Sequence, residues 1–239
     1  AAIRRAEARG AIVGLNSDSG FSTLERRANQ LSISGPIIAE RGALVQPVRG
    51  APLTPLIPET LRFLELRDRF LDALTIGQRS HQYVIVLGDV NALSNALPSI
   101  PPRVLHAPVA VLVNGVRTCS LAFYVRRRVD CEWVLDEAAL DEVIAILEEA
   151  GPHCEPLWSA RDILDRNPTY GICIVHHKNT QKTRAVGWIL EHAGTRPVYM
   201  IGNSMSDDLK DACVIQCAVG NASPEYKARC LETGGFVAQ

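Results

Sequence analysis

Short apolar segments alternate with amphipathic helical segments at both ends of the chain, and this alternation constrains the fold more than any other feature. Residues 1–9 are expected to be helical, and a second helix ends at Leu31. Residues 11–15 and 36–39 are expected to form short apolar strands. The same alternation returns from residue 171 onward. Strands that alternate with helices favour a parallel sheet that helices cover on both faces.

The C-terminal part follows the same order of elements. Apolar strands are expected at residues 172–175, 198–201 and 214–219, and helices at residues 180–193 and 207–212. Ser223 followed by Pro224 is typical of a helix start, because serine caps the first turn and proline fits the first helical position. A final helix is therefore expected after Ser223.

The middle of the chain has a different pattern. The prolines between residues 47 and 58 are typical of a linker. The Asn114-Gly115 pair lies between the apolar segments 109–113 and 116–125 and predicts an antiparallel hairpin. Around this hairpin we expect a strand at residues 83–88 and helices at residues 59–74, 91–97 and 136–150.

An antiparallel hairpin packed with helices is a different architecture from a parallel sheet built of alternating strands and helices. The chain is therefore predicted to hold one α/β domain that is interrupted by an inserted α+β domain. The α/β domain comprises residues 1–46 and 171–239, and the insertion with its linker comprises residues 47–170.

The composition excludes several classes of partner. The 25 Lys and Arg residues balance 26 Asp and Glu residues, whereas a nucleic-acid-binding surface normally shows a basic excess. No apolar run approaches the roughly 18–20 residues of a membrane span. We therefore expect neither nucleic acid nor a membrane as a partner. Seven cysteines without a CxxC pair favour reduced thiols and a cytoplasmic protein, and the sequence assigns no oligomeric state.

Polar clusters follow the carboxyl ends of the predicted strands, where open parallel sheets bind ligands. They are residues 16–19, Lys182 at a helix start, and residues 202–208. A hydroxyl, a lysine and a carboxylate at one edge of a sheet suit a phosphate with a divalent cation. Each cluster also has a structural interpretation: Ser17 suits a capping turn, Lys182 a solvated charge and Asp207 a helix N-terminus.

Other binding motifs are weaker. The segment from Gly14 to Gly20 has five residues between its glycines where a phosphate-binding loop has four, and Phe21 stands in place of the required lysine. No glycine-rich dinucleotide fingerprint is present, which weakens the alternative of an α/β nucleotide-binding protein. His176 and His177 are expected to point to opposite faces of a strand, so a shared metal is not expected.

Five segments, taken in this order, resemble a known family. They are residues 15–19 (LNSDS), residues 34–43 (SGPIIAERGA), Lys182, residues 202–207 (GNSMSD) and residues 218–222 (AVGNA). The chain resembles the haloacid dehalogenase-like phosphatases, and among them the branch with a large inserted cap that contains sucrose-phosphatase and mannosyl-3-phosphoglycerate phosphatase. The resemblance implies a Rossmann-like parallel-sheet core of the α/β class with an inserted α+β cap domain.

The resemblance also implies an activity and a set of site residues. The activity is Mg²⁺-dependent hydrolysis of a small phosphorylated metabolite, with sugar phosphates as one class, through an aspartyl-phosphate. The implied residues are Ser17, Lys182 and Asp207 for catalysis, Ser17, Asp18, Lys182 and Asn221 for substrate binding, and Asn203 and Asp207 for the metal. The cap is expected to close over the substrate and to set specificity.

The sequence departs from the family at its most important motif. The Asp-X-Asp segment, which carries the nucleophile on the central strand, is absent from this sequence, and Asn203 stands where the family has Asp. Without that strand, backbone groups at the centre of the sheet would be unpaired. Three explanations stay open: the segment precedes Ala1 in a longer protein, another polypeptide supplies it, or the chain is a pseudophosphatase that binds a ligand or protein without catalysis. Asn203 favours the third, because truncation alone would not produce it.

Overall fold

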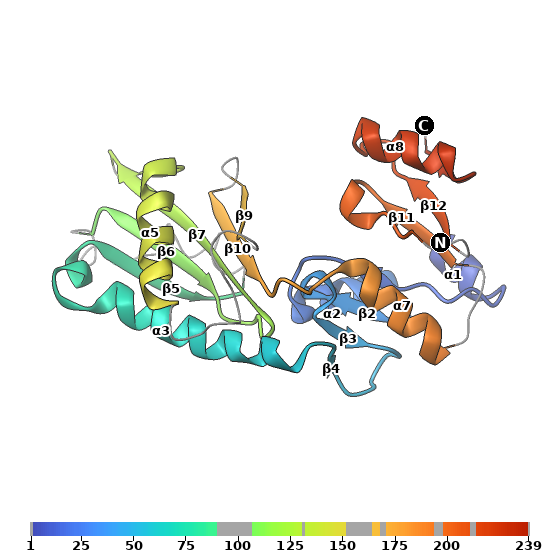
Figure 1. Ribbon diagram of the computed structural model, residues 1–239, viewed down its shortest axis with the longest axis horizontal. Coiled ribbons are helices and arrows are strands. Elements are labelled where there is room, and N and C mark those ends of the chain that lie inside the picture. The colour runs from blue at the N-terminus through green and yellow to red at the C-terminus, as the bar shows by residue number, and fades with distance from the viewer. Residues whose placement is uncertain are drawn as a thin grey trace. The chain divides into compact units, whose positions relative to one another are not determined.

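The computed structural model describes residues 2–89, 107–130, 132–151, 164–167, 171–193, 198–210 and 214–238. The chain divides into two compact units, and each of them contains helices and strands (Figure 1). Unit 1 comprises Ala1–Ser19, Leu24–Leu56 and Thr180–Gln239. Unit 2 comprises Gly20–Thr23 and Ile57–Asn179.

Two sheets lie in the described part of unit 1. The first has the strand order β1 (Leu15–Asn16), β2 (Ile37–Ala39), β3 (Leu44–Gln46) and β4 (Thr54–Pro55). Strands β1 and β2 are parallel, and β3 and β4 continue the sheet in antiparallel pairs. Two helices, α1 (Ala2–Glu7) and α2 (Phe21–Leu31), belong to the same N-terminal segment.

The N-terminal strand differs from its prediction. The apolar pattern predicts a strand over residues 11–15, but only Leu15 and Asn16 pair with β2. Gly10, just before this segment, has a φ of +87°, a left-handed conformation that glycine adopts readily, and residues 11–14 form no strand. The proline-rich segment also differs, since it contains β4 and is not only a linker.

The second sheet of unit 1 contains β11 (Val198–Gly202), β12 (Val214–Ala218) and β13 (Phe236–Val237), which are all parallel. The final helix, α8 (Pro224–Glu232), begins as predicted, because the Ser223 side chain accepts a hydrogen bond from the Tyr226 N–H. The predicted helix over residues 207–212 is instead a 3₁₀ turn at Met205–Asp207, and residues 211–213 lie outside the described ranges.

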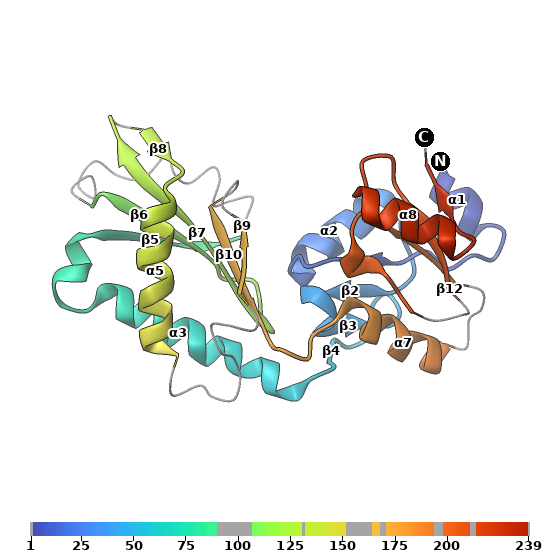
Figure 2. The same ribbon diagram turned by 45° about the horizontal axis from the view of Figure 1, so that its top comes forward.

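One helix, α7 (Lys182–Ala193), packs against both sheets of unit 1 (Figure 2). Its apolar face shares one core with residues of the first sheet and of the second. This core contains Ile38, Val45, Ala185, Val186, Ile189, Leu190, Met200, Leu209 and Val214. No backbone ladder joins the two sheets in the described part of the chain, so β1 and β11 are both edge strands.

Unit 2 is built on one sheet whose described strands have the order β5-β6-β7-β10-β9, with β8 paired to β7. The strands are β5 (Tyr83–Gly88), β6 (Val109–Asn114), β7 (Ser120–Val129), β8 (Glu132–Val134), β9 (Leu164–Asn167) and β10 (Ile172–His176). Helices α3 (Phe63–Thr75) and α5 (Glu137–Ala150) pack on one face of the sheet (Figure 1). The Phe70 and Phe123 rings, 5.0 Å apart, lie in this core.

Two elements of unit 2 differ from their predictions. Strand β7 begins at Ser120 and not at residue 116, because the connection after Asn114 is longer than a two-residue turn. Strand β10, which the sequence analysis places in the core domain, pairs with β7 and β9. Its buried Cys173 and Val175 face the α3–α5 core. The helix predicted at residues 91–97 lies outside the described residues.

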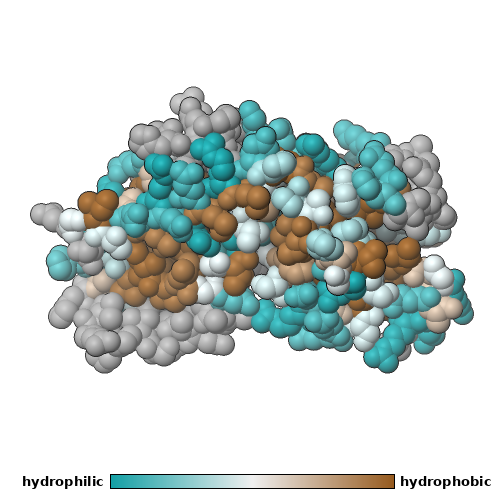
Figure 3. Space-filling view, turned by 90° about the horizontal axis from the view of Figure 1, so that it is seen from below, coloured by the Kyte–Doolittle hydropathy of each residue, from teal (hydrophilic) through white to brown (hydrophobic). Residues whose placement is uncertain are grey.

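None of the helices described for this chain is long and apolar enough to cross a membrane. The described cysteines Cys119, Cys173, Cys217 and Cys230 are not joined by disulfides, and burial raises the pKa of Cys217 and Cys230. Apolar residues also reach the surface of unit 2, where Figure 3 shows them gathered in a patch at the left.

The N-cap of α5 gives a stability prediction. The Asp136 carboxylate accepts a hydrogen bond from the Ala139 N–H and pairs with Arg127, and the Ala139 bond is the main reason that its pKa is lowered. We expect Asp136→Ala to lower the free energy of unfolding by about 1 kcal/mol at neutral pH. A lowered pKa means that the native carboxylate contributes stability above its unfolded-state pKa and loses it as the pH falls through the folded-state pKa.

Urea denaturation of the wild type and of Asp136→Ala at neutral and acidic pH measures this difference. The control is Asp136→Asn, which keeps a capping oxygen and so should lose less stability than Asp136→Ala at neutral pH. An equal difference between wild type and Asp136→Ala at both pH values would contradict the assignment.

Candidate functional site

Lys182, the first residue of α7, lies where the carboxyl ends of β1 and β11 approach each other. Its ammonium group donates a hydrogen bond of 3.1 Å to Asp207 Oδ1 and lies 3.3 Å from Asp18 Oδ2. Ser206 Oγ is 3.4 Å from the same nitrogen. The Lys182 residue is only 8% exposed, so the ion pairs replace most of the water that would otherwise solvate its charge. The structure thus brings together Asp18, Lys182 and Asp207, three of the residues predicted from the sequence.

The backbone after β11 orients the Asp207 carboxylate. Oδ1 accepts from Lys182, and Oδ2 accepts a 3.0 Å hydrogen bond from the Asn203 N–H. The turn packs so closely on the strand end that a Cβ atom on Gly202 would lie 2.5 Å from Asp207 Cβ. A glycine is therefore required at position 202 for the carboxylate to reach Lys182.

The loop after β1 is fixed by its own hydrogen bonds and by the segment after β2. Ser17 Oγ accepts a 3.2 Å hydrogen bond from the Ser19 N–H, which is the capping-turn arrangement expected as the structural alternative. The Ser17 N–H donates to Ile38 O, and the Glu40 N–H donates to Ser19 O. Ser17 is thus held within the loop, and the next residue, Asp18, contacts Lys182.

The turn after β2 lies very close to the backbone at the start of α7. The 3₁₀ turn Glu40–Gly42 ends at Gly42, which has a φ of +91°. A Cβ atom on Gly42 would lie 2.3 Å from Gln181 O, one residue before Lys182. Glycine at this position therefore allows the β1–β2 end of the sheet to approach α7 closely.

The two predicted asparagines are not held against Lys182 by side-chain contacts. Asn203 is exposed, and its backbone donates a hydrogen bond to Asp207 and accepts one from the Ser223 N–H. Asn221 is exposed in the loop before α8. Within the described ranges, no hydrogen bond or ion pair connects Asn221 with Lys182 or Asp207. A metal role for Asn203 and a substrate role for Asn221 stay predictions.

Comparison with solved structures identifies the fold. No protein-family model matches the sequence, and no curated protein matches it. A haloacid dehalogenase-like hydrolase from Bacteroides thetaiotaomicron aligns with 98% of this chain and 84% of its own, at a TM-score of 0.60 and 14% identity. A haloalkanoate-superfamily phosphatase from the same organism gives a TM-score of 0.52 at 16% identity, over 99% of this chain and 79% of its own. The chain has the haloacid dehalogenase-like fold.

A third structure of this fold is a protein related to trehalose-6-phosphate phosphatase. It covers 99% of this chain and 79% of its own length, with a TM-score of 0.53 and 11% identity. These alignments confirm the predicted fold class, a Rossmann-like α/β core with a cap, and the resemblance stated from the motifs. At these identities the comparison establishes the fold, and the residues of the site have to be judged from their own geometry.

One polar network beside the site was missed by the sequence analysis. Asp208 points away from Lys182, accepting from Gln216 Nε2 at 3.2 Å and from Arg229 Nε at 3.2 Å. The Tyr226 hydroxyl donates to Gln216 Oε1, and burial raises the pKa of this phenol. These contacts fix α8 on β12. The signal in the sequence is Gln216, a polar residue inside the apolar segment 214–219.

The described residues around Lys182 do not make a Mg²⁺ site by themselves. Mg²⁺ prefers six oxygen ligands, commonly one or two carboxylates together with waters and phosphate oxygens. Both Asp207 oxygens are already engaged, and no group of three Asp, Glu, His or Cys side chains converges within the described residues. Two carboxylates, Asp18 and Asp207, against one ammonium leave a single net negative charge.

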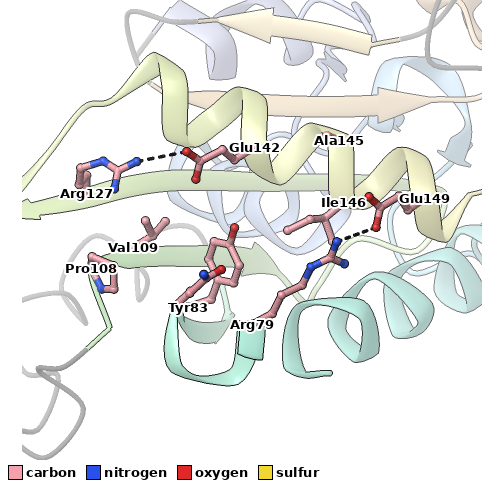
Figure 4. Close-up of a pocket in the computed structure, with 10 residues that line it drawn as sticks. Arg79, Tyr83, Pro108, Val109, Arg127, Glu142, Ala145, Ile146 and Glu149 are labelled. Atoms are coloured by element: carbon pink, nitrogen blue, oxygen red, sulfur yellow. Dashed lines mark hydrogen bonds and ion pairs between the residues drawn. The ribbon is translucent and has the colours of Figure 1, made fainter. Parts of the chain in front are cut away.

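A hollow also lies in unit 2. It encloses about 500 Å³ beside β5, β6 and α5, and Figure 4 shows its charged side chains pairing with one another, Arg79 with Glu149 and Arg127 with Glu142. Because the charges are compensated within the protein, we assign no ligand to this pocket.

The close packing at Gly202 can be tested by comparing its substitution with that of Gly187, a glycine around which there is space for a side chain. We expect Gly202→Ala to lower the free energy of unfolding by about 1–3 kcal/mol, because the new methyl group would displace Asp207. Gly187 lies within α7, and a Cβ atom there would have no neighbour within 4 Å, so Gly187→Ala should raise stability by about 0.5–1 kcal/mol. Urea denaturation measures both. Equal effects of the two substitutions would contradict the packing described for Gly202.

Proposed function

We propose that the chain provides the phosphate-binding part of a phosphatase-type hydrolase that acts on a small phosphorylated metabolite. The observation that carries this proposal is the buried Lys182 between Asp18 and Asp207 at the carboxyl ends of β1 and β11. A lysine held in this way is a fixed positive charge next to the loop of residues 16–19. It lies at the edge where open parallel sheets bind ligands. The fold is that of hydrolases that include phosphatases, which supports the same reaction class.

The two carboxylates around Lys182 have different roles in this proposal. Asp207 is buried and held by the Asn203 N–H, so it keeps the lysine in place. The Asp18 side chain is 37% exposed and can move into solvent. A phosphoryl group would take the place of Asp18 on the Lys182 ammonium and would accept a hydrogen bond from the Ser17 hydroxyl. Asp18 therefore competes with the substrate for Lys182.

Hydrolysis also needs a nucleophile, which the resemblance places on a strand that ends in Asp-X-Asp. Two features of unit 1 support a place for such a strand between β1 and β11. Both are edge strands of separate sheets that share α7 and meet at Lys182. The buried amide of Asn16, at the end of β1, has no hydrogen-bond partner among the described residues, although buried amides normally have one. Since Asp207 and Asn203 alone do not make a Mg²⁺ site, we assign the metal-dependent reaction only to a chain that carries that strand.

The second candidate function is binding without turnover. Asn203 favours it, because an amide at this position removes one negative charge from the place where the family has an acidic residue. A phosphorylated metabolite would then be held by Lys182 and Ser17 as a ligand. Sugar phosphates are one class to test for both candidates, since one structure of this fold is related to trehalose-6-phosphate phosphatase.

Binding of orthovanadate, an analogue of phosphate, tests the anion site in this chain. We expect Ser17→Ala to weaken binding about tenfold by removing a charge-assisted hydrogen bond. Asp18→Asn should strengthen binding several-fold, because it frees Lys182 from a competing carboxylate. Isothermal titration calorimetry measures the dissociation constants, and Ser34→Ala, whose hydroxyl donates to Glu7, is the matched control. Weaker binding by Asp18→Asn, or none by the wild type, would contradict the proposed roles.

Turnover separates the two candidate functions. Phosphate release from an aryl phosphate is compared in the present chain and in a chain extended at its N-terminus by a strand ending in Asp-X-Asp, each with Asn203 and with Asn203→Asp. A Mg²⁺-stimulated rate in the extended chain that Asn203→Asp increases supports the hydrolase. Vanadate binding without release in any of the four proteins supports the binding protein.

A further inference from the structure

The 3₁₀ turn after β2 places three successive residues in the left-handed region of backbone conformation. The φ angles of Glu40, Arg41 and Gly42 are +51°, +60° and +91°. Glycine adopts such angles without strain, whereas in other L-residues the Cβ atom comes too close to the backbone, which costs free energy. Asparagine and aspartate tolerate this conformation better than most residues. Arg41 is therefore a long, charged side chain at a backbone position that suits glycine or asparagine.

This turn is attached to the loop of residues 16–19, which carries the proposed phosphate-binding hydroxyl. The Glu40 N–H donates to Ser19 O at 3.0 Å, and the Arg41 N–H donates to Ser17 O at 3.3 Å. On its other side Gly42 packs against the start of α7, which lies beside β2 (Figure 2). The contacts on both sides hold the turn in its left-handed conformation. They also place the Arg41 backbone one hydrogen bond away from Ser17.

The two strained side chains of the turn differ in their surroundings. Glu40 is completely buried, so its side chain belongs to the packing of unit 1. Arg41 is partly exposed, so packing alone does not account for its side chain. Residues in strained backbone conformations cluster at functional sites, where the surrounding contacts maintain the strain. Since glycine would fit the same backbone without strain, we look for the role of Arg41 in its guanidinium group.

The charge balance of the site indicates that role. Lys182 is paired with two carboxylates, and when Asp18 moves into solvent the remaining pair, Lys182 with Asp207, has no net charge. A phosphate monoester carries about −1.5 to −2 charges at pH 7. One ammonium group that is already paired with a carboxylate compensates this charge incompletely. A guanidinium beside the loop would add a full positive charge and paired N–H donors that match phosphate oxygens.

We propose that Arg41 is a specificity-determining residue that binds the phosphoryl group of the substrate together with Lys182 and Ser17. Its long side chain starts from a backbone that is hydrogen-bonded to Ser17, so a phosphoryl group at the Ser17 hydroxyl lies within its reach. The added charge would make the site prefer the doubly charged phosphate monoesters to singly charged carboxylates. This inference rests on the proposed function, because it names a further residue of the same site.

Replacing Arg41 by glycine separates binding from stability. Dissociation constants for inorganic phosphate are measured by calorimetry, and midpoints of unfolding by thermal denaturation, for wild type, Arg41→Gly, Arg41→Asn and Arg41→Lys. Arg41→Gly and Arg41→Asn should each weaken phosphate binding about tenfold, because they remove the charge and the paired donors. Since both relieve the left-handed strain, they should raise the midpoint of unfolding by up to about 4 °C. A variant that is at least as stable and binds more weakly has lost an interaction with the anion.

Arg41→Lys keeps the charge and the strain. It should weaken binding less than Arg41→Gly and leave the midpoint of unfolding nearly unchanged. The charge also predicts a salt effect: raising sodium chloride from about 0.05 M to about 0.5 M should weaken phosphate binding more in wild type than in Arg41→Gly. Acetate, which has one charge, should bind wild type more weakly than phosphate does, and Arg41→Gly should reduce this difference.

Ser32→Gly is the matched control for relief of strain. Ser32 has a φ of +57° and follows α2, a helix of 11 residues and thus roughly 16 Å long that begins next to the loop of residues 16–19. Glycine at this position relieves the same kind of strain at the far end of the helix. Ser32→Gly should change phosphate binding less than about twofold.

The outcomes distinguish this inference from the proposed function. Equal phosphate affinities in wild type and Arg41→Gly, while Ser17→Ala still weakens binding, would overturn the role of Arg41 and leave the proposed function standing. Equal losses in Arg41→Lys and Arg41→Gly, with the same salt dependence as wild type, would overturn the role of its charge. No saturable phosphate binding by wild type would overturn both the proposed function and this inference.

Discussion

The ion pairs of Lys182 are the interaction on which the arrangement of unit 1 depends. One ammonium group, almost completely buried, links the loop after β1 through Asp18 and the turn after β11 through Asp207. The two strands belong to separate sheets, and besides Lys182 they are held together by the apolar face of the same helix, α7. A buried charge that lost its partners would destabilise the protein by several kcal/mol. Lys182 can therefore stay buried only while carboxylates neutralise its charge.

This constraint also decides what the site can do. A lysine compensated by two carboxylates does not attract an anion strongly until one carboxylate moves, and Asp18 is the exposed one. The chain therefore combines a buried ion pair, Lys182 with Asp207, with a second carboxylate, Asp18, whose side chain is partly exposed to solvent.

The sequence predicted the fold class and the convergence of Asp18, Lys182 and Asp207, because strand–helix alternation fixes where carboxyl ends meet. It did not predict that β10 joins the unit 2 sheet, since an apolar strand carries no information about which core it enters. A helix was expected at residues 207–212, but Asp207 ends a 3₁₀ turn, Met205–Asp207, that packs closely against Gly202. The sequence also did not predict that Asp208 pairs with Arg229, because such a pair depends on tertiary contacts that a local sequence pattern does not specify.

A double-mutant cycle on Lys182 and Asp207 tests the central claim most directly. The free energies of unfolding of wild type, Lys182→Met, Asp207→Asn and the double variant are measured by urea denaturation at neutral pH. A buried, hydrogen-bonded ion pair predicts a favourable coupling energy of more than about 1 kcal/mol, so that the double variant loses clearly less stability than the sum of the single losses. Additive losses would show that the two side chains do not interact, and would contradict the account of this site.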